Sequence, residues 1–103
     1  MSAIQLQTNA LREAAGRATS LLRVLANEDR LLLLCQLAQG EKCVSELEAL
    51  LDIRQPTLSQ QLGVLRAERV VITRREGKHI YYRVRKGHAL DVLHALYAIY
   101  CRR

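Results

Sequence analysis

Cysteines are the side chains of this sequence best suited to covalent chemistry, because a thiolate is a strong nucleophile. The chain has three of them, Cys35, Cys43 and Cys101. An odd number at irregular spacing does not form the paired framework of a disulfide-rich secreted protein. We therefore expect reduced thiols. A thiolate of this kind can attack a sulfane sulfur, become a persulfide and be captured by a second thiol.

A second set of side chains is suited to recognising DNA bases. After the only proline, three leucines at helical spacing predict a helix with one buried face: Leu58, Leu62 and Leu65. At about 100° per residue, Gln60 lies on the opposite face among small residues. Glutamine can pair with adenine, and hydroxyl groups bond bases or phosphates. We predict DNA contacts from four residues of this segment, and the alternative is an ordinary polar surface: Gln55, Thr57, Ser59 and Gln60.

Four cationic side chains gather between two runs of β-prone residues. The runs cover residues 70–73 and 80–85, and Gly77 supplies turn geometry between them, so this segment predicts a β-hairpin. Cations at a hairpin tip can bind DNA phosphates, which sets the affinity and its salt dependence. The alternative is a charged edge that prevents strand-to-strand aggregation. The four predicted phosphate-binding residues are Arg74, Arg75, Lys78 and His79.

A helix-turn-helix is the element that would position the base-recognising residues. Ser45 and Glu48 match a capping box, which predicts a short helix over residues 46–51. Pro56 fits the first position of the next helix, where its missing amide costs nothing. A short helix, a brief turn and a second helix form the arrangement that places one helix in the major groove of DNA.

Further helices flank this unit. Apolar residues at three- and four-residue spacing predict a helix over 8–25, and Asn27 is a suitable N-cap for a second helix that ends at Gly40. The last segment, residues 88–101, is apolar almost all round. A surface helix does not have that composition, so we expect the terminal helices 8–25 and 88–101 to form the interface of a homodimer.

Length and composition limit the class of protein. The 103 residues fit a single domain, and a chain rich in Leu and Ala without Phe or Trp favours a mainly α fold. The net charge of +6 favours a nucleic-acid partner over a membrane. The longest apolar run, residues 31–35, is too short to cross a bilayer, and the chain opens without a signal segment. We expect a cytoplasmic protein without membrane partner or cofactor.

Four segments resemble the ArsR/SmtB family of winged-helix repressors: LANEDRL at 25–31, VSEL at 44–47, SQQLGVL at 59–65 and REGKHIYY at 75–82. The resemblance covers about four fifths of the chain. It implies a winged helix-turn-helix, mainly α with a β-hairpin wing between the fourth and fifth helices. It also implies a homodimer that represses transcription from double-stranded operator DNA. Two positions depart from the family pattern: Gln61 replaces a common His, and Arg69 replaces a Gly before the first wing strand.

The thiols resemble one branch of that family in particular. Cys35 in the second helix and Cys101 at the end of the last are similar to the cysteines of BigR, SqrR and YgaV-like sensors of sulfide and persulfides. The resemblance implies that a small reactive-sulfur inducer joins Cys35 to Cys101 through a disulfide or polysulfide bridge, with release of DNA. Cys35 has a simpler alternative as a small buried apolar residue, and Cys101 as an incidental terminal thiol.

Three other functions compete with this interpretation. A metal or arsenite sensor would need a second cysteine two residues after Cys43, where this chain has Ser45, or a cluster on the last helix such as His88, Asp91 and His94. A thiol peroxidase using Cys43 would need a pocket, a positioned base and a substrate-binding loop, and the sequence offers neither a glycine-rich phosphate cradle nor a nucleophile motif. An architectural DNA-binding protein would keep its DNA affinity when its thiols are oxidised.

Overall fold

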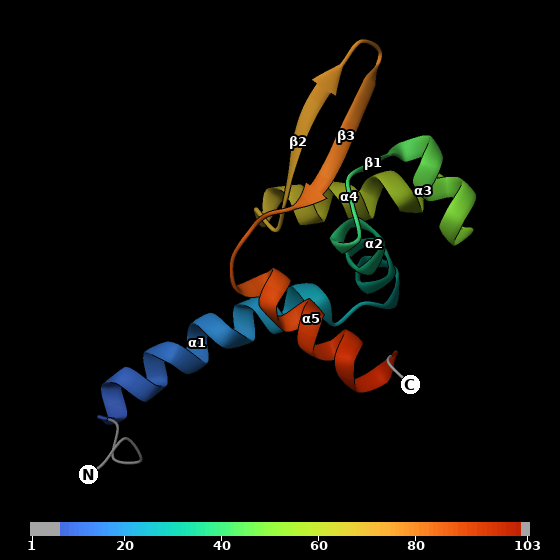
Figure 1. The fold of residues 1–103 in the computed structure, drawn as a ribbon. Helices are drawn as coiled ribbons and strands as arrows, with labels where there is room; N and C mark the ends of the chain where they lie inside the picture. The colour runs from blue at the N-terminus through green and yellow to red at the C-terminus, as the bar shows by residue number, and fades with distance from the viewer. Residues whose placement is uncertain (1–6, 102–103) are drawn as a thin grey trace.

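The computed structural model of the protein describes residues 7–101, which form five helices and three strands. Figure 1 shows α1 and the β2–β3 hairpin projecting from the body in different directions. This is the winged helix-turn-helix, mainly α with a β-hairpin wing, that the sequence predicts. The elements in order are α1 (Thr8–Leu25), α2 (Glu28–Ala38), β1 (Lys42–Cys43), α3 (Val44–Leu51), α4 (Thr57–Ala67), β2 (Val71–Glu76), β3 (His79–Val84) and α5 (His88–Tyr100).

Helix α2 lies at the centre of the core and packs against α1, α3, α4, α5 and β3. Its start is fixed by Asn27, whose side-chain oxygen accepts the Arg30 amide at 3.0 Å, as the sequence predicts. The buried side chains are aliphatic, and burying each of them stabilises the fold by about 1.5–3 kcal/mol. The fully buried leucines of α2, α3, α4 and α5 make the largest contribution: Leu33, Leu34, Leu47, Leu58, Leu62, Leu65 and Leu93.

The start of α3 differs from the prediction. The helix begins at Val44, and the Cys43 amide donates to the Glu46 carboxylate at 2.9 Å. This contact also lowers the pKa of Glu46. The predicted Ser45–Glu48 capping box is therefore wrong, because Cys43 holds the extended N-cap conformation. The reason is strand β1, which pairs Cys43 with Tyr81 of β3 and fixes the backbone two residues earlier.

The sheet has three antiparallel strands in the order β1-β3-β2, one more than the predicted hairpin. Strand β2 also extends beyond the predicted residue 73, so Arg74 and Arg75 lie in the strand and not in the turn. The turn is Gly77–Lys78, and Gly77 has a φ of +62°, which glycine adopts without a steric cost. The hairpin consequently carries its cations along the strand as well as at the tip.

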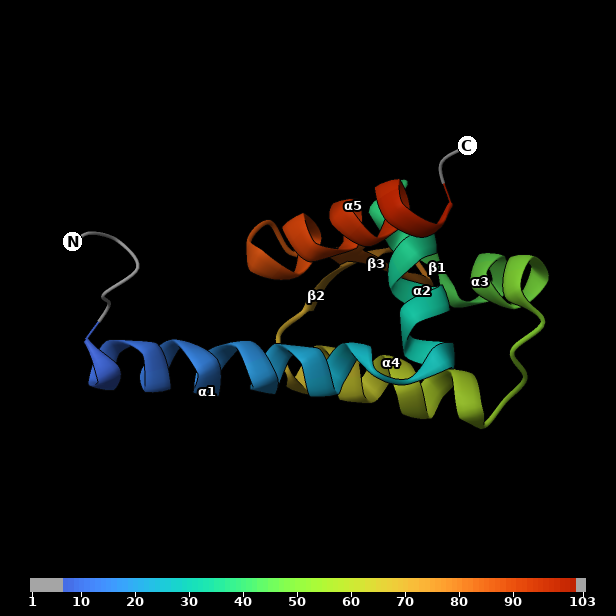
Figure 2. The same ribbon diagram turned by 90° about the horizontal axis from the view of Figure 1, so that it is seen from below.

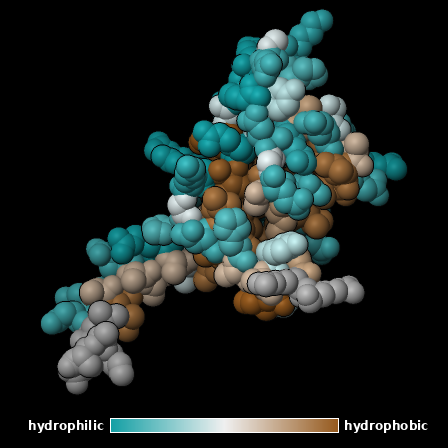
Figure 3. All heavy atoms as spheres, viewed as in Figure 1, coloured by the Kyte–Doolittle hydropathy of each residue, from teal (hydrophilic) through white to brown (hydrophobic). Residues whose placement is uncertain are grey.

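Helix α1 has the predicted bounds and α5 ends one residue before the predicted residue 101, and both helices bury little within this chain. Only Val24 and Leu25 of α1 are buried, at its C-terminal end, and only Leu93 of α5. Figure 2 shows α1 extending well past the rest of the molecule. In Figure 3, hydrophilic side chains cover the hairpin, whereas hydrophobic ones appear around α5 and along part of α1. Among the described residues, no helix is both long and apolar enough to span a membrane.

Candidate nucleic-acid interface and thiol pair

Helix α4 presents a polar face outward because its leucines anchor the opposite face. Leu58, Leu62 and Leu65 are buried against the core. Of the four predicted DNA-contacting residues on or next to α4, Gln55, Ser59 and Gln60 are exposed and Thr57 is half-buried. The 100° geometry of the helix therefore places Gln60 outward as predicted. Such an exposed amide beside small residues is able to meet base edges in a groove.

Gln55 has a local contact that the sequence did not indicate. Its side-chain oxygen accepts the Ser59 backbone amide at 3.1 Å. This amide is one of the first-turn donors of α4, which have no partner inside a helix. Gln55 therefore stabilises the start of α4 through its side-chain oxygen, which leaves its amide NH2 group available for other contacts. Its predicted DNA contact stays a prediction.

The wing carries three of the predicted phosphate-binding residues in exposed positions, and Arg83 on β3 is exposed as well. Arg75, Lys78 and His79 are exposed on β2, the turn and β3. The structure gives none of them a salt bridge among residues 7–101. The β2 strand packs on α4, so the wing rises from beside the helix that carries Gln60 (Figure 1). Base-recognising and phosphate-binding candidates thus belong to adjoining elements.

Arg74 has a different environment from Arg75. Its guanidinium forms ion pairs with Glu41 and Glu76, the second at 2.6 Å, and lies over the Tyr81 ring at 4.7 Å from the centroid. The hydrogen bonds to Glu41 raise the pKa of Arg74, and the same contact lowers the pKa of Glu41. Two carboxylates therefore neutralise this cation. Glu41 is a functional neighbour that sequence inspection missed, since it lies 33 positions from Arg74.

The structure brings the two predicted sensing thiols into one neighbourhood. Cys35 is half-buried on α2, and Cys101 is exposed at the C-terminal end of α5. Burial raises the pKa of the Cys35 thiol, and negative charge on Cys101 raises it further. Helices α2 and α5 pack on each other, so the two thiols lie on adjoining elements. Both are free thiols in this structure.

A small cavity of about 220 Å³ opens beside Cys35. Its walls come from α2 and α5 and are mostly apolar, with the two polar side chains Gln39 and His94. The cavity lies between the two helices that carry the thiols. It therefore gives a small reagent access to a sulfur that is otherwise only half exposed.

Cys43 lies apart from this pair. It is buried at the start of α3, and its sulfur is 3.3 Å from the Ser45 hydroxyl. The proposed metal alternatives have little support here: in the part of the chain that the structure describes, no group of three or more His, Cys, Asp or Glu side chains is placed to hold a metal ion. His88, Asp91 and His94 are all exposed on α5.

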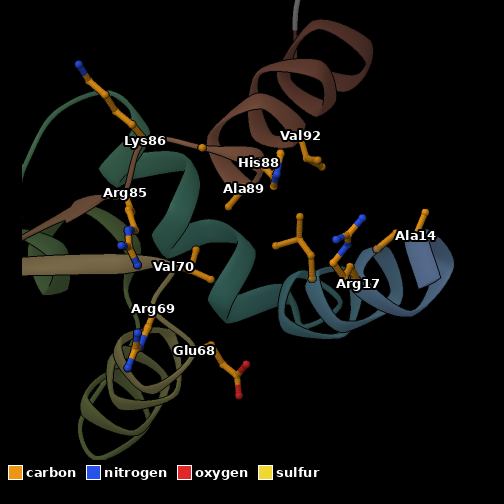
Figure 4. A pocket seen from close by; sticks show the side chains of 13 residues that line it. Ala14, Arg17, Glu68, Arg69, Val70, Arg85, Lys86, His88, Ala89 and Val92 are labelled. Carbon is orange, nitrogen blue, oxygen red and sulfur yellow. The ribbon is translucent and has the colours of Figure 1, made fainter. Parts of the chain in front are cut away.

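A larger cleft of about 670 Å³ lies between α1 and the start of α5 (Figure 4). In the figure Arg17 projects from α1, and His88 and Val92 project from α5 on the other side. Arg69, Arg85 and Lys86 add further positive charge to the lining. None of the residues predicted for DNA contact or sensing lines it. The cleft lies between the two helices predicted for the dimer interface.

Comparison with known proteins identifies the family. Residues 27–73 match the model of the bacterial regulatory protein, arsR family. The chain is 56% identical over 92 residues to a biofilm growth-associated repressor of Agrobacterium fabrum, covering 89% of this chain and 79% of the relative. The chain belongs to the arsR family. Its relatives are transcriptional regulators, so this arsR-family chain is a DNA-binding regulator of transcription and not an enzyme.

Solved structures support the same fold for this arsR-family chain. The repressor BigR of Xylella fastidiosa matches with a TM-score of 0.87 and 44% identity, covering 92% of this chain and 94% of BigR. The regulator HlyU of Vibrio vulnificus matches with the same TM-score and 35% identity, covering 90% of this chain and 97% of HlyU. A protein named transcriptional activator HlyU, from Vibrio cholerae, is 34% identical and covers 89% of this chain and 85% of the relative.

Proposed function

We propose that this arsR-family chain is a transcriptional repressor that binds double-stranded operator DNA as a homodimer, and that a small reactive-sulfur inducer releases it by bridging Cys35 and Cys101. The direction of control is supported by the relatives with the higher identity, which are named repressors. A repressor works where the DNA is, so the proposal places the chain in the cytoplasm.

The main support for DNA recognition is the orientation of α4. Gln60 is exposed on one face of this helix, and three leucines are buried on the opposite face. A rigidly packed helix with an outward amide and small neighbours can lie deep in the major groove. Thr57 and Ser59 flank Gln60, and Arg75, Lys78 and His79 are available for phosphates on the adjoining wing. Arg74 contributes less to this surface, because Glu41 and Glu76 already neutralise it.

Exposed apolar side chains on the terminal helices support the homodimer. Ile99 is 68% exposed and Tyr100 is 79% exposed at the end of α5, and Leu11 and Leu22 are more than half exposed on α1. Large apolar groups in water are unfavourable, and a second copy of the chain would cover them. Two α4 helices in a symmetric dimer would then meet half-sites about 34 Å apart, one turn of DNA.

The difference in exposure between the two thiols suggests an order for the bridging reaction. Cys101 is exposed and meets the inducer first. Its thiolate attacks the outer sulfur of a persulfide, RS–SH, to give Cys101–S–SH and RS⁻. The Cys35 thiolate then attacks the Cys101 sulfur, which forms the Cys35–Cys101 disulfide and releases HS⁻. The two thiolates lose two electrons and the transferred sulfur gains them. When a second sulfur has been transferred, giving Cys101–S–S–SH, attack of the Cys35 thiolate on the sulfur next to the terminal one releases HS⁻ and leaves a bridge that is one sulfur longer.

Such a bridge would tie α2 to the end of α5. Helix α2 also packs on α4, so a shift of α2 against α5 is able to move the recognition helix relative to the dimer contact. DNA release then requires only that the bridged dimer prefers a different spacing of its two α4 helices. Allosteric coupling of this kind is typically worth about 1–3 kcal/mol, or about 5- to 150-fold in affinity.

The proposal is tested by serine substitution of each thiol. An operator is first selected from a random double-stranded pool with the reduced protein. Affinity for it is then measured by fluorescence anisotropy before and after sodium tetrasulfide. We expect a loss of tenfold or more for the unmodified chain and for the control Cys43→Ser, whose thiol lies elsewhere. Cys35→Ser and Cys101→Ser should bind DNA and ignore tetrasulfide, so a normal response from either refutes the two-thiol switch.

A further inference from the structure

One arginine in the first turn of α2 contacts three helices at once. The Arg30 Nε donates to the Val24 carbonyl at 2.7 Å, and Nη2 donates to the Arg23 carbonyl at 3.1 Å, both at the end of α1. Its Nη1 donates to the Gln61 side-chain oxygen on α4 at 3.0 Å. The Arg30 backbone amide is itself held by the Asn27 side chain. A single guanidinium therefore links α1, α2 and α4.

The chemistry of these contacts makes the link rigid. The last carbonyls of α1 have no partner inside the helix, and the negative end of its dipole favours a cation there. A guanidinium is planar and presents its donors in a fixed fork, so the two α1 carbonyls determine where Nη1 points. Arg30 is also half-buried, which weakens the competition of water for these hydrogen bonds.

Gln61 is the point at which this link reaches the DNA-contacting helix. It is half-buried and lies next to the exposed Gln60 on α4. Helices α1 and α4 each pack on α2 but do not pack extensively on each other. The Arg30–Gln61 contact therefore supplies a polar connection between them where apolar packing is sparse.

We propose that Arg30 is a positioning residue that fixes the recognition helix α4 relative to α1 through Gln61, and that operator specificity depends on this link. The inference rests on the proposed function, in which α1 contributes to the dimer and α4 contacts the bases. In a symmetric dimer, the spacing and tilt of the two α4 helices follow from the angle between α1 and α4 in each copy. Sequence-specific contacts need that spacing to match the half-sites, whereas contacts to phosphates tolerate a change in it.

The test compares variants that keep or remove the acceptor oxygen of Gln61 and the guanidinium of Arg30. Arg30→Lys keeps the charge and loses the fork, and Gln61→Ala removes the acceptor. Gln61→Glu keeps an acceptor oxygen for the guanidinium and serves as the rescue. Gln36→Ala, also half-buried on α2 and without a side-chain hydrogen bond among residues 7–101, is the matched control. For each reduced protein we would measure affinity for the selected operator and for random duplex DNA, the dimer content by sedimentation, and the unfolding midpoint.

Arg30→Lys and Gln61→Ala should lose about tenfold in operator affinity and less than about twofold on random DNA, while both remain folded dimers. Gln61→Glu and Gln36→Ala should retain operator preference. Equal losses on both DNAs, or a preference retained by Arg30→Lys and Gln61→Ala, would overturn the positioning role. An unmodified chain without any operator preference would instead contradict the proposed function, and the inference with it.

Discussion

The part of the molecule predicted to contact DNA and the terminal helices differ in how far their apolar side chains are buried. All three leucines of α4 are buried within the chain, with Leu58 fully inaccessible, and α2 buries Leu33, Leu34 and Leu37. In α5 the large side chains at the end of the helix face solvent, with Tyr100 at 79% exposure. The first region needs no second copy to cover its apolar side chains, because they are buried in the core and its outer face is polar. The terminal helices have an apolar surface that one copy leaves uncovered, and we expect a second copy to cover it.

The largest effect should come from charging the terminal apolar surface. Ile99→Glu places a carboxylate in the expected interface, where burying an unpaired charge is strongly unfavourable. The chain should sediment as a folded monomer. It should lose about 100-fold or more in operator affinity, since two separate monomers then bind the two half-sites independently. Leu50→Glu, a similarly exposed residue on α3, is the control and should remain dimeric. A monomeric Leu50→Glu or a dimeric Ile99→Glu would place the interface elsewhere.

The next effect tests whether the α4 face recognises bases. Gln60→Ala removes the outward amide without touching the buried leucines. Operator affinity should fall about tenfold, within the 1–3 kcal/mol that a good base contact supplies. Binding to random duplex DNA should stay within about twofold. Titration of both duplexes by fluorescence anisotropy makes the comparison, and equal losses on the two would remove Gln60 from base recognition.

The two wing arginines should behave differently although they are neighbours in the sequence. Arg75→Ala should lower the slope of log affinity against log salt by about 1, as expected for one lost phosphate contact. Arg74→Ala should change the slope less, because Glu41 and Glu76 already neutralise that cation. Glu41→Gln should increase the slope by releasing Arg74. Equal slope changes for Arg74→Ala and Arg75→Ala would show that the carboxylates do not matter for DNA binding.

A smaller effect concerns the joint between α4 and the wing. Arg69 has a φ of +61°, a left-handed conformation that costs about 1–2 kcal/mol for a residue with a side chain. Arg69→Gly should therefore raise the free energy of unfolding, by up to about 1 kcal/mol after the added chain entropy of glycine is subtracted. Arg66→Gly, inside α4, should lower it by about 1 kcal/mol. Urea unfolding at one fixed protein concentration compares the two, and changes of the same sign would contradict the account.

The smallest effect concerns the pH dependence of the half-buried thiol. The pKa of Cys35 is raised by burial and then by charge on Cys101, so less of its thiolate is present at a given pH. Cys101→Ser removes the second cause, which lowers the Cys35 pKa and moves its pH–reactivity curve to lower pH. Burial remains, so the curve should not return fully to that of an ordinary thiol. Iodoacetamide labelling against pH measures the shift, and an unchanged curve would place the two sulfurs too far apart to interact.

Local signals in the sequence were sufficient for much of the fold. The Asn27 cap, the bounds of the first helix and the buried leucines of α4 all depend on residues within a few positions of each other. The start of α3 was not predictable in this way, because Ser45 with Glu48 and Cys43 with Glu46 have the same spacing. Pairing of β1 with β3 decides between them.

In the candidate site, too, features that depend on nearby residues were predictable and contacts between distant residues were not. Helical geometry alone placed Gln60 outward, and a resemblance to known sensors indicated the thiol pair. The Glu41–Arg74 and Arg30–Gln61 contacts join residues 33 and 31 positions apart. No periodicity or motif connects such positions, since only the packing of α2 against α4 and of the wing against its neighbours brings them together.

The central claim is that a bridge from α2 to the end of α5 controls DNA binding. The most direct test is intact-mass spectrometry of the reduced protein before and after glutathione persulfide, with peptide mapping and operator binding measured on the same samples. The account predicts one bridge per chain between Cys35 and Cys101, and a bridged fraction equal to the fraction that no longer binds the operator. A bridged protein with unchanged affinity, or DNA release without a bridge, would contradict it.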